Sequence, residues 1–347
     1  MDWLNRVKLP PEVPGLSIAV MDDGQISYAQ GFGVCEAGQP APVTTETLLQ
    51  ACSVSKAVTA LGVLRLVEMK ELHLDQEIDR THHHWSRLQG SIPLRGITLR
   101  RLLSHTAGVN LPWSAGYHPE EDIPTLDEVL NGDKPSLYPA IEVTSPPGRG
   151  FNYSAGGYCV IQKVMEHTIG MPFPELMRGV VLDPLKMEHS TFEQPLPREW
   201  QALAAIGHRA TGRPLGGKWR VYPEMAAAGL WTTPSDLALL ALDLQNALSG
   251  HDGTLLTQET ARLMVTPVAD AGERGKVGLG VFIEGEGPGA RFGHPGDNEG
   301  YTAAWSSLLE GDKGAVIMTN SDAGWLSQSD ILGEVARTRN WPGYPND

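Results

Sequence analysis

The chain has 347 residues, which exceeds the usual size of one simple domain and favours one large domain or two closely packed ones. Its formal net charge of −14 argues against nucleic acid or an anionic membrane as its main partner. Cys35, Cys52 and Cys159 show neither metal-ligand spacing nor a disulfide pattern, and no apolar run has the length of a signal segment or a membrane span. We therefore expect a cytoplasmic protein, whose oligomeric state the sequence leaves open.

The first predicted element is a β-hairpin over residues 15–34. Two apolar runs with strand character flank Asp22-Asp23-Gly24, which is a strong turn signal. The next residues, 35–50, have the composition of a loop. The N-terminal segment is thus expected to add two strands to a sheet before the first helix.

A long apolar run from residue 53 to residue 72 predicts a helix, because its apolar residues recur at three- and four-residue steps. Ser53 and Lys56 stand three residues apart at its start, and residues at this spacing share one helix face. A serine hydroxyl is a weak nucleophile until a neighbouring base accepts its proton, and a buried lysine could act as that base. Because Ser-x-x-Lys also arises often by chance, the assignment depends on partners elsewhere in the chain.

The middle of the chain, from about residue 73 to residue 275, is rich in Pro, Gly and His. Helices are predicted over residues 97–105, 155–168 and 233–249, separated by irregular segments. Thr98 and Thr233 are the candidate N-caps of the first and the last of these helices.

Two histidine motifs in this middle part invite a functional interpretation. His105 ends a predicted helix and could be taken for a catalytic base, but a histidine there is more often a capping or core group, which we favour. His82-His83-His84 resembles a metal site, but consecutive residues cannot all face one ion, and no carboxylate completes the set. We therefore expect a solvated loop and no metal.

Strand character returns after residue 275, where Val277, Leu279 and Val281 alternate with small residues. Further strands are predicted over 291–294, 301–305 and 315–319, with a hairpin turn at 310–314 and a last helix over 324–338. Strands at both ends of the chain with helices between them predict an α+β fold, in which the N- and C-terminal segments form one antiparallel sheet flanked by helices. Within this single domain (1–347) the sheet part would comprise 1–80 with 275–347, and 81–274 would be a large, mainly helical insertion.

Two further segments could complete a site around Ser53. Tyr153 stands just before the predicted helix 155–168, where it could act as a general base near a lysine or simply be a half-buried aromatic residue. Residues 293–300 are rich in glycine and lie between two strand-like segments, so their backbone could approach a ligand and donate an N–H to an oxyanion. A plain hairpin turn would have the same composition.

In this order and at these separations, the segments resemble those of the serine β-lactamase and penicillin-binding protein superfamily. The likeness covers nearly the whole chain and is strongest to the branch of class C β-lactamase-like esterases and D-aminopeptidases. It is carried by residues 14–20, Ser53-Val54-Ser55-Lys56, 98–109, Tyr153-Ser154, 228–237, and His294-Pro295-Gly296, which stands where β-lactamases have Lys-Thr-Gly.

The resemblance implies that Ser53 attacks a carbonyl carbon and forms an acyl-enzyme. Lys56 and Tyr153 would share the proton transfers, and which of the two is the base stays open. The backbone N–H groups of Ser53 and Asp297 would form the oxyanion hole. No metal or cofactor is needed.

Departures from the family pattern bear on the substrate. Ala155 stands where β-lactamases have an asparagine that contacts the substrate amide, and His294 replaces the lysine that helps to hold the substrate carboxylate. Both changes weaken a penicillin-type site. Asp297 would repel an anionic substrate and could attract an amine, or its side chain could face solvent. We expect these three residues, with Gly296 and Trp113, to bind the substrate.

Four aromatic residues of the insertion, Trp113, Tyr117, Trp219 and Tyr222, could wall an apolar acyl pocket or could equally be packing residues. The leading expectation is a serine hydrolase that cleaves small carboxylic esters and has weak or no β-lactamase activity. The alternatives are a D-amino-acid amidase or D-aminopeptidase, an acyltransferase, and a catalytically silent homologue that only binds a ligand. In each case the expected partner is a small molecule, such as an ester or amide, and neither nucleic acid nor a membrane.

Overall fold

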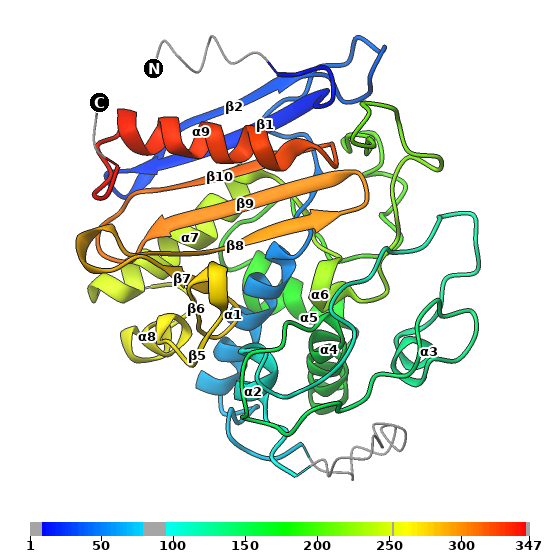
Figure 1. The fold of residues 1–347 in the computed structure, drawn as a ribbon, viewed down its shortest axis with the longest axis vertical. Helices are drawn as coiled ribbons and strands as arrows, with labels where there is room; N and C mark the ends of the chain where they lie inside the picture. Colours follow the sequence, from blue (N-terminus) through cyan, green and yellow to red (C-terminus); the bar gives the residue numbers. More distant parts are fainter. Residues whose placement is uncertain (1–8, 79–94, 252, 345–347) are drawn as a thin grey trace.

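The structure is a computed structural model, and it describes residues 9–78, 95–251 and 253–344. Within these residues one antiparallel sheet has eight strands, and the two ends of the chain supply its neighbouring strands (Figure 1). In spatial order the strands are β2 (Gln25–Gly33), β1 (Gly15–Asp22), β10 (Gly314–Thr319), β9 (Tyr301–Leu308), β8 (Arg291–Asn298), β7 (Phe282–Glu284), β6 (Lys276–Val277) and β5 (Ala269–Asp270). The predicted α+β fold, with one sheet built from both ends of the chain, is confirmed.

Helices lie on both faces of the sheet and fill the part of the molecule beside it (Figure 1). They are α1 (Val54–Glu68), α2 (Leu99–Leu103), α3 (Leu126–Asn131), α4 (Ala155–Ile169), α5 (Phe173–Met177), α6 (Met225–Ala228), α7 (Pro234–Ser249), α8 (Gln258–Val265) and α9 (Gly324–Thr338), with the short turns η2 (Arg178–Leu182), η3 (Gly272–Arg274) and η4 (Gly287–Gly289). Two short strands, β3 (Leu49–Gln50) and β4 (Trp231–Thr232), pair apart from the main sheet. The predicted caps are confirmed, because the side chains of Thr98 and Thr233 accept backbone N–H groups at the starts of α2 and α7.

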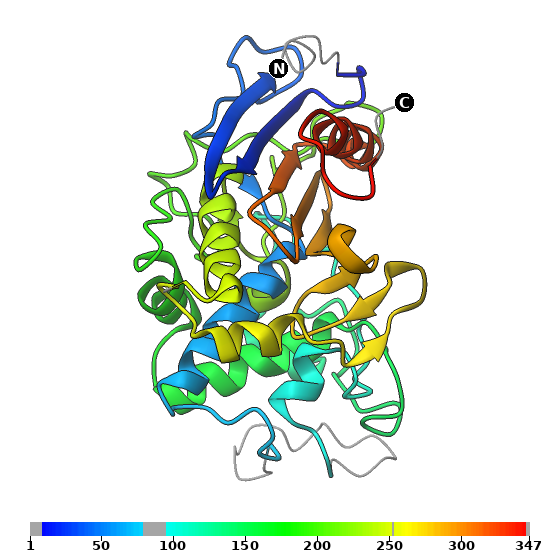
Figure 2. The same ribbon diagram turned by 90° about the vertical axis from the view of Figure 1, so that its left-hand side faces the viewer.

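The sheet separates two apolar layers, because successive side chains of a strand point to opposite faces. On β1, Ile18 belongs to the same apolar cluster as Ile331 and Val335 of α9, whereas Ala19 belongs to the larger core that contains α1 and α7. Helix α9 contacts β9 and β10 on one face, and α7 contacts β1, β2 and β10 on the other (Figure 2). Because both faces are covered, β1 is buried along its whole length.

Helix α1 carries the Ser-x-x-Lys motif between the sheet and the helical part (Figure 2). It contacts β8 and β9 on one side, and α6 and η2 on the other. Nearly every residue from Val54 to Leu66 is buried, so the helix is covered all round rather than amphipathic. A lysine on this helix is therefore enclosed by protein.

The predicted single strand over 277–281 is wrong. β6 ends at Val277 and β7 begins at Phe282, and between them the Gly278 N–H donates to Val281 O at 2.9 Å. Gly280 has φ of +80°, a left-handed conformation that a strand does not contain. The alternation of apolar and small residues therefore marks a turn packed on the core.

The glycine-rich segment 293–300 is mostly strand, since β8 runs to Asn298 and leaves Glu299 and Gly300 as the turn into β9. His82-His83-His84 lies outside the described residues. Among the residues that are described, no helix combines the length and the apolar character that crossing a membrane requires. β5 and α7 come from the middle of the chain although they belong to the sheet layers, and the division into a sheet part and a helical part stays a prediction.

Candidate active site

Ser53 lies at the start of α1 with its hydroxyl free for chemistry. It is the N-cap residue, but its side chain makes no capping hydrogen bond. Lys56 Nζ lies 3.2 Å from Ser53 Oγ, and Lys56 is only 1% exposed. The two residues that the sequence places on one helix face are thus in direct contact.

The residue before this serine has a strained backbone. Cys52 has φ of +53°, a conformation that costs a non-glycine residue about 1–3 kcal/mol. Its buried Sγ donates to Gln50 O at 3.2 Å, and burial raises the pKa of the Cys52 thiol well above its usual range. Cys52 is therefore a poor competitor of Ser53 as a nucleophile and acts through the backbone turn that begins α1.

A second hydrogen bond fixes the lysine. Lys56 Nζ donates to Ala227 O at 2.8 Å, from the short helix α6. That helix is itself held at its start, because the N–H groups of Ala227 and Ala228 both donate to Glu224 O at 3.0 Å. With Ala227 O on one side and Ser53 Oγ on the other, the amine is directed at the serine.

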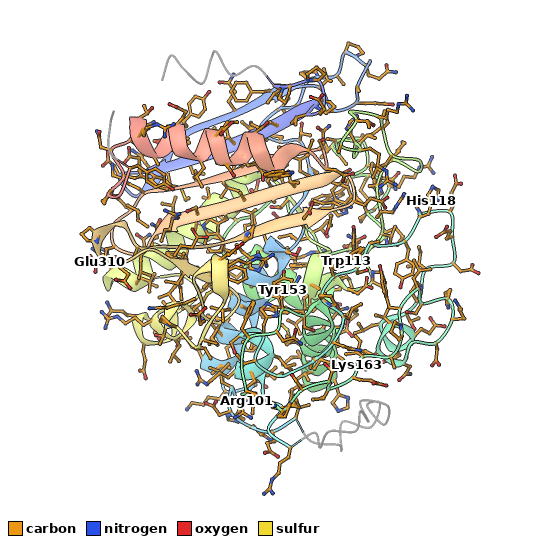
Figure 3. The ribbon with its side chains drawn as sticks, in the orientation of Figure 1. Arg101, Trp113, His118, Tyr153, Lys163 and Glu310 are labelled. Atoms are coloured by element: carbon orange, nitrogen blue, oxygen red, sulfur yellow. The ribbon has the colours of Figure 1, made fainter. Side chains whose placement is uncertain are left out.

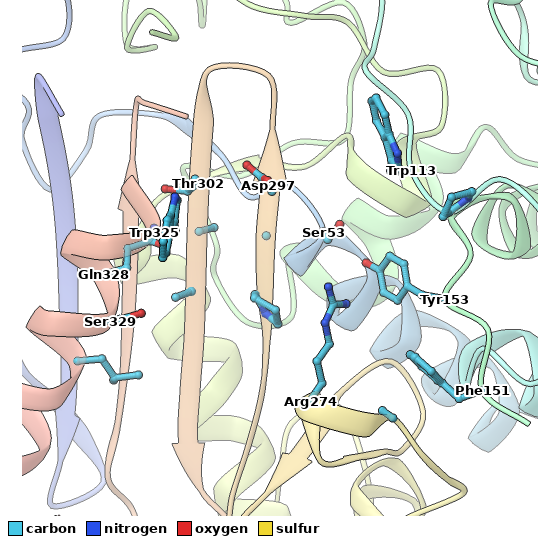
Figure 4. Close-up of a pocket in the computed structure, with 17 residues that line it drawn as sticks. Ser53, Trp113, Phe151, Tyr153, Arg274, Asp297, Thr302, Trp325, Gln328 and Ser329 are labelled. Carbon is cyan, nitrogen blue, oxygen red and sulfur yellow. The ribbon is translucent and has the colours of Figure 1, made fainter. Parts of the chain in front are cut away.

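Tyr153 lies at the start of α4, close to the lower edge of the sheet, and its hydroxyl points toward Ser53 (Figures 3 and 4). Lys56 Nζ lies 5.1 Å from the centroid of the Tyr153 ring. Ser154 caps α4, because its Oγ accepts the Gly157 N–H at 2.8 Å. The helix start therefore brings Tyr153 to the Ser53–Lys56 pair, as the sequence analysis expects of a proton carrier.

Strand β8 passes very close to the start of α1. A Cβ atom at Gly296 would lie 2.7 Å from Ala51 O and 3.0 Å from Ser53 N. Only glycine fits such an approach of two backbones. The glycine therefore allows the β8 backbone to reach Ser53.

The open edge of β8 faces Ser53 (Figure 4). Within the described residues β7 pairs with β8 no further than Gly293, so the rest of β8 pairs with β9 alone. Pro295 has no N–H to donate to β9, and residues two apart in a strand direct their N–H groups to the same side. The N–H of Asp297 is therefore directed to the open edge, and its role with the N–H of Ser53 as an oxyanion hole stays a prediction.

A cavity of about 700 Å³ opens over these groups. Ser53 and Tyr153 line its centre, and it continues across β8 and β9 to the first turns of α9 (Figure 4). Trp113 on one wall is 64% exposed and Trp325 on α9 is 59% exposed. The volume suits a small-molecule substrate with groups on both sides of the serine.

The five predicted substrate-binding residues divide into two groups. Gly296, Asp297 and Trp113 line the cavity, whereas Ala155 and His294 are buried beneath it. Burial first, and then the charge of Lys56, lowers the pKa of His294 to about 3. His294 is therefore neutral near pH 7 and does not supply the positive charge of the lysine that it replaces.

The other aromatic residues of the insertion are packing residues. Tyr117, Trp219 and Tyr222 are all buried, and the Trp219 ring meets the Trp231 ring edge-on at 5.3 Å. Of the four candidates only Trp113 lines the cavity. Among the described residues no group of three or more His, Cys, Asp or Glu side chains could hold a metal ion.

Arg274 lines the cavity although nothing in the sequence predicts it. Its guanidinium extends from η3 toward Ser53 and Tyr153, and lies 5.2 Å from the Tyr153 ring centroid and 5.4 Å from that of Phe282 (Figure 4). No carboxylate of a described residue forms an ion pair with it, so its charge is available to a substrate anion. A single arginine in a glycine-containing loop carries no sequence signal. Trp325, on the other side of the cavity, was also not predicted, because the helical pattern of 324–338 does not show that this residue faces a cavity.

Asp297 adds the opposite charge to the cavity. Its side chain lines the cavity near Thr302, its partner on β9 (Figure 4). Burial and the nearby Asp322 raise the pKa of Asp297 from its ordinary value of 3.8. The cavity thus holds a guanidinium group that extends toward Ser53 and Tyr153, and a carboxyl group on β8 near Thr302.

The chain is similar to known proteins over most of its length. The family model described as Beta-lactamase matches residues 5–332. Penicillin-binding protein 4 of Amycolatopsis lactamdurans is 26% identical over 359 residues, which cover 97% of this chain and 90% of that protein. Protein flp of Staphylococcus aureus strain MW2 is 25% identical over 230 residues, which cover 64% of this chain and 42% of that protein, so the chain spans less than half of that relative.

Solved structures resemble the whole fold. A crystal structure of SurE with D-Leu has a TM-score of 0.73 and 26% identity, and the match covers 97% of this chain and 73% of that one. The D-amino acid amidase of Ochrobactrum anthropi SV3, complexed with L-phenylalanine, has a TM-score of 0.76 at 20% identity over 98% of this chain and 96% of that one. The latter likeness concerns the fold.

Proposed function

This chain belongs to the beta-lactamase family, and from that premise we propose that it is a serine hydrolase that forms an acyl-enzyme on Ser53. The observation that carries the proposal is the contact of 3.2 Å between Ser53 Oγ and the enclosed Lys56 Nζ. The Ser53 hydroxyl makes no helix-capping hydrogen bond and lies beside a buried amine. Nucleophilic catalysis by serine needs such an arrangement.

In the proposed reaction Ser53 Oγ attacks the substrate carbonyl carbon, and its proton passes to Lys56 or Tyr153. The carbonyl oxygen takes the negative charge and is held by the N–H groups of Ser53 and Asp297. The same proton is then delivered to the leaving oxygen or nitrogen as its bond to carbon breaks. A water molecule releases the acyl group by the reverse sequence and restores Ser53.

We propose small carboxylic esters as the substrates, with weak or no β-lactamase activity. Two observations support this choice: His294 is buried and neutral, and Ala155 is buried and offers no amide group. A site of this kind lacks two contacts that the family resemblance attributes to recognition of a β-lactam. A small ester that carries neither a side-chain amide nor a carboxylate would not need these two contacts.

A D-amino-acid amide or peptide is the second candidate, and the carboxyl group of Asp297 favours it. Asp297 lines the cavity beside Ser53, where it could bind a substrate ammonium group. Arg274 could hold a carboxylate on the leaving group. Similarity to a D-amino acid amidase and to SurE bound to D-Leu is consistent with this candidate.

The nucleophile is tested with a short-chain p-nitrophenyl ester. We expect mass spectrometry of the quenched reaction to find the acyl group on the peptide containing Ser53. Ser53→Ala should lose about a thousandfold or more in kcat. Ser55→Ala, two residues further along the same helix, is the matched control. Equal activity of Ser53→Ala and the wild type would refute the assignment.

The substrate class is tested by comparing p-nitrophenyl esters, D-alanine p-nitroanilide and nitrocefin. We expect the ester to be hydrolysed with the highest kcat/KM. Asp297→Asn should lower kcat/KM about tenfold for the amine-bearing substrate and leave the neutral ester within about twofold. A clear preference for nitrocefin would contradict the ester proposal, and an unchanged ratio in Asp297→Asn would remove the amine-binding role.

A further inference from the structure

Helix α2 ends in a backbone turn that many helices complete with glycine. The His105 N–H donates to Leu102 O at 3.2 Å and the Thr106 N–H donates to Arg101 O at 2.8 Å, which are the two hydrogen bonds of a Schellman motif. His105 occupies the left-handed position of this motif with φ of +55°. A side chain strains this conformation and glycine does not, so glycine at this position would remove the imidazole and leave the turn intact.

His105 holds both residues that flank Tyr153. Its carbonyl oxygen accepts the Asn152 N–H at 2.7 Å, and its Nδ1 accepts the Ser154 N–H at 3.1 Å. Its ring centroid lies 4.4 Å from that of Tyr153, with the two planes 33° apart. His105 is buried and does not line the cavity, so it touches Tyr153 from the side away from the substrate.

We propose that His105 is a positioning residue, which fixes the Tyr153 hydroxyl against Ser53 and Lys56 through its ring and its Nδ1 acceptor. This inference rests on the proposed function, because the position of Tyr153 matters to catalysis only if Tyr153 carries a proton. Nδ1 accepts a hydrogen bond only while it is unprotonated, so the ring acts as the neutral tautomer with its hydrogen on Nε2.

The surroundings of His105 preserve this neutral form. Burial lowers the pKa of His105 well below its usual range, and the positive charges of Lys56 on α1 and Arg274 on η3 lower it further, whereas the neighbouring His294 on β8 is itself neutral near pH 7. Tyr158 of α4 packs on the same ring at 5.3 Å and brings no charge near neutral pH. His105 Nδ1 therefore remains a hydrogen-bond acceptor near neutral pH. Protonation in acid would turn Nδ1 into a donor that faces the N–H of Ser154.

Three variants separate this role from a purely structural one. His105→Gly removes the ring and the acceptor but relieves the backbone, whereas His105→Asn keeps an acceptor and tolerates the left-handed conformation. Lys70→Gly is the matched control, because exposed Lys70, with φ of +64°, ends α1 in the same motif. With p-nitrophenyl acetate we expect kcat to fall about thirtyfold in His105→Gly and less than about fivefold in His105→Asn, with KM within about twofold. Lys70→Gly should match the wild type.

A double-mutant cycle with Tyr153→Phe tests whether His105 acts through Tyr153. We expect His105→Gly combined with Tyr153→Phe to be no slower than Tyr153→Phe alone, because the positioned hydroxyl is already gone. Thermal unfolding of each variant shows separately whether it is folded. His105→Ala also removes the ring but leaves the strained backbone in place, so its kcat is compared with that of His105→Gly. Two results would overturn the positioning role. One is that the reductions in kcat from His105→Gly and Tyr153→Phe multiply in the double variant. The other is that His105→Gly and His105→Ala are as active as Lys70→Gly.

Ser53→Ala, measured alongside, distinguishes the two proposals. An active Ser53→Ala would refute the serine mechanism itself. An inactive Ser53→Ala together with a fully active His105→Gly would refute only the role of His105.

Discussion

Glu224 is a fully buried carboxyl group close to the carbonyl oxygen that holds Lys56. Its Oε1 accepts the Ser114 hydroxyl at 3.0 Å, and its backbone oxygen accepts the N–H of Ala227, whose own oxygen binds Lys56. Burial raises the pKa of Glu224 from 4.5 to about 7. This residue therefore joins the cavity wall near Trp113 to α6, and it exchanges a proton near neutral pH.

We expect Glu224→Gln to change how stability depends on pH. In the wild type the folded state keeps the Glu224 proton up to a pKa of about 7, whereas the unfolded state loses it near 4.5. The folded protein thus binds more protons between these values, and its stability falls as pH rises through that window, by at most about 3 kcal/mol. Glutamine cannot ionise. Urea unfolding should therefore show that the free energy of unfolding of the variant increases relative to that of the wild type between pH 4.5 and pH 7. Parallel curves would contradict the buried carboxyl group.

Arg274 is predicted to select substrates by charge. Arg274→Gln removes the guanidinium that faces Ser53 and Tyr153 in the cavity. We expect the ratio of kcat/KM for an ester with a carboxylate in its leaving group to that for its neutral analogue to fall about tenfold. Arg274→Lys keeps a positive charge and should restore part of the ratio. A constant ratio across the three proteins would show that the arginine serves only to cover the Tyr153 ring.

The contact between β8 and the start of α1 is the element-level feature on which the site depends. A methyl group at Gly296 would meet Ala51 O, Cys52 Cβ and Ser53 N at 2.7, 2.8 and 3.0 Å. Gly296→Ala must therefore push the strand away from the nucleophile, and a displacement of this kind costs about a hundredfold in kcat/KM. Gly179→Ala is the control, because nothing lies within 4 Å of a Cβ at that glycine. Equal activity of the two variants would contradict the close approach.

The sequence predicts elements well where a local rule determines the chain. The turn at Asp22-Asp23-Gly24 and the caps Thr98 and Thr233 depend on residues within one turn, and the structure has all of them. The strand at 277–281 was wrong because an apolar and small alternation fits a core-facing turn as well as a strand. Local rules also cannot locate the turn within residues 293–300, because the extent of pairing between β8 and β9 determines where the strand ends.

The site shows the same limit at the scale of side chains. Ser53 and Lys56 are one helical turn apart, so their contact follows from sequence spacing alone. Arg274 reaches the cavity only because the turn that carries it, between β5 and β6, packs beside Tyr153, which no spacing in the sequence reveals. The burial of His294 under the cavity is equally a product of tertiary packing.

At the scale of the whole molecule, the outer layer formed by α9 is expected to be essential for folding. Val335 is 2% exposed and packs in the apolar cluster between α9 and the sheet. Val335→Asp would bury a charge without a partner and should lower the free energy of unfolding by about 3 kcal/mol or more. Thr338→Asp introduces the same group at an exposed position of α9 and should cost less than about 1 kcal/mol. Denaturant unfolding of both variants checks this, and similar midpoints would contradict the assigned layer.

The pairing of β1 with β10 has a consequence for biosynthesis. The ribosome makes β1 from Gly15 and its neighbour β10 only from Gly314, and at about 5–20 residues per second the interval is on the order of tens of seconds. For most of that interval the nascent polypeptide carries Ser53 without β8, the strand whose Gly296 packs against the start of α1. The growing chain therefore holds the edge of β1 open to chaperones until β10 is made, and the proposed site around Ser53 cannot form before β8 has been synthesised.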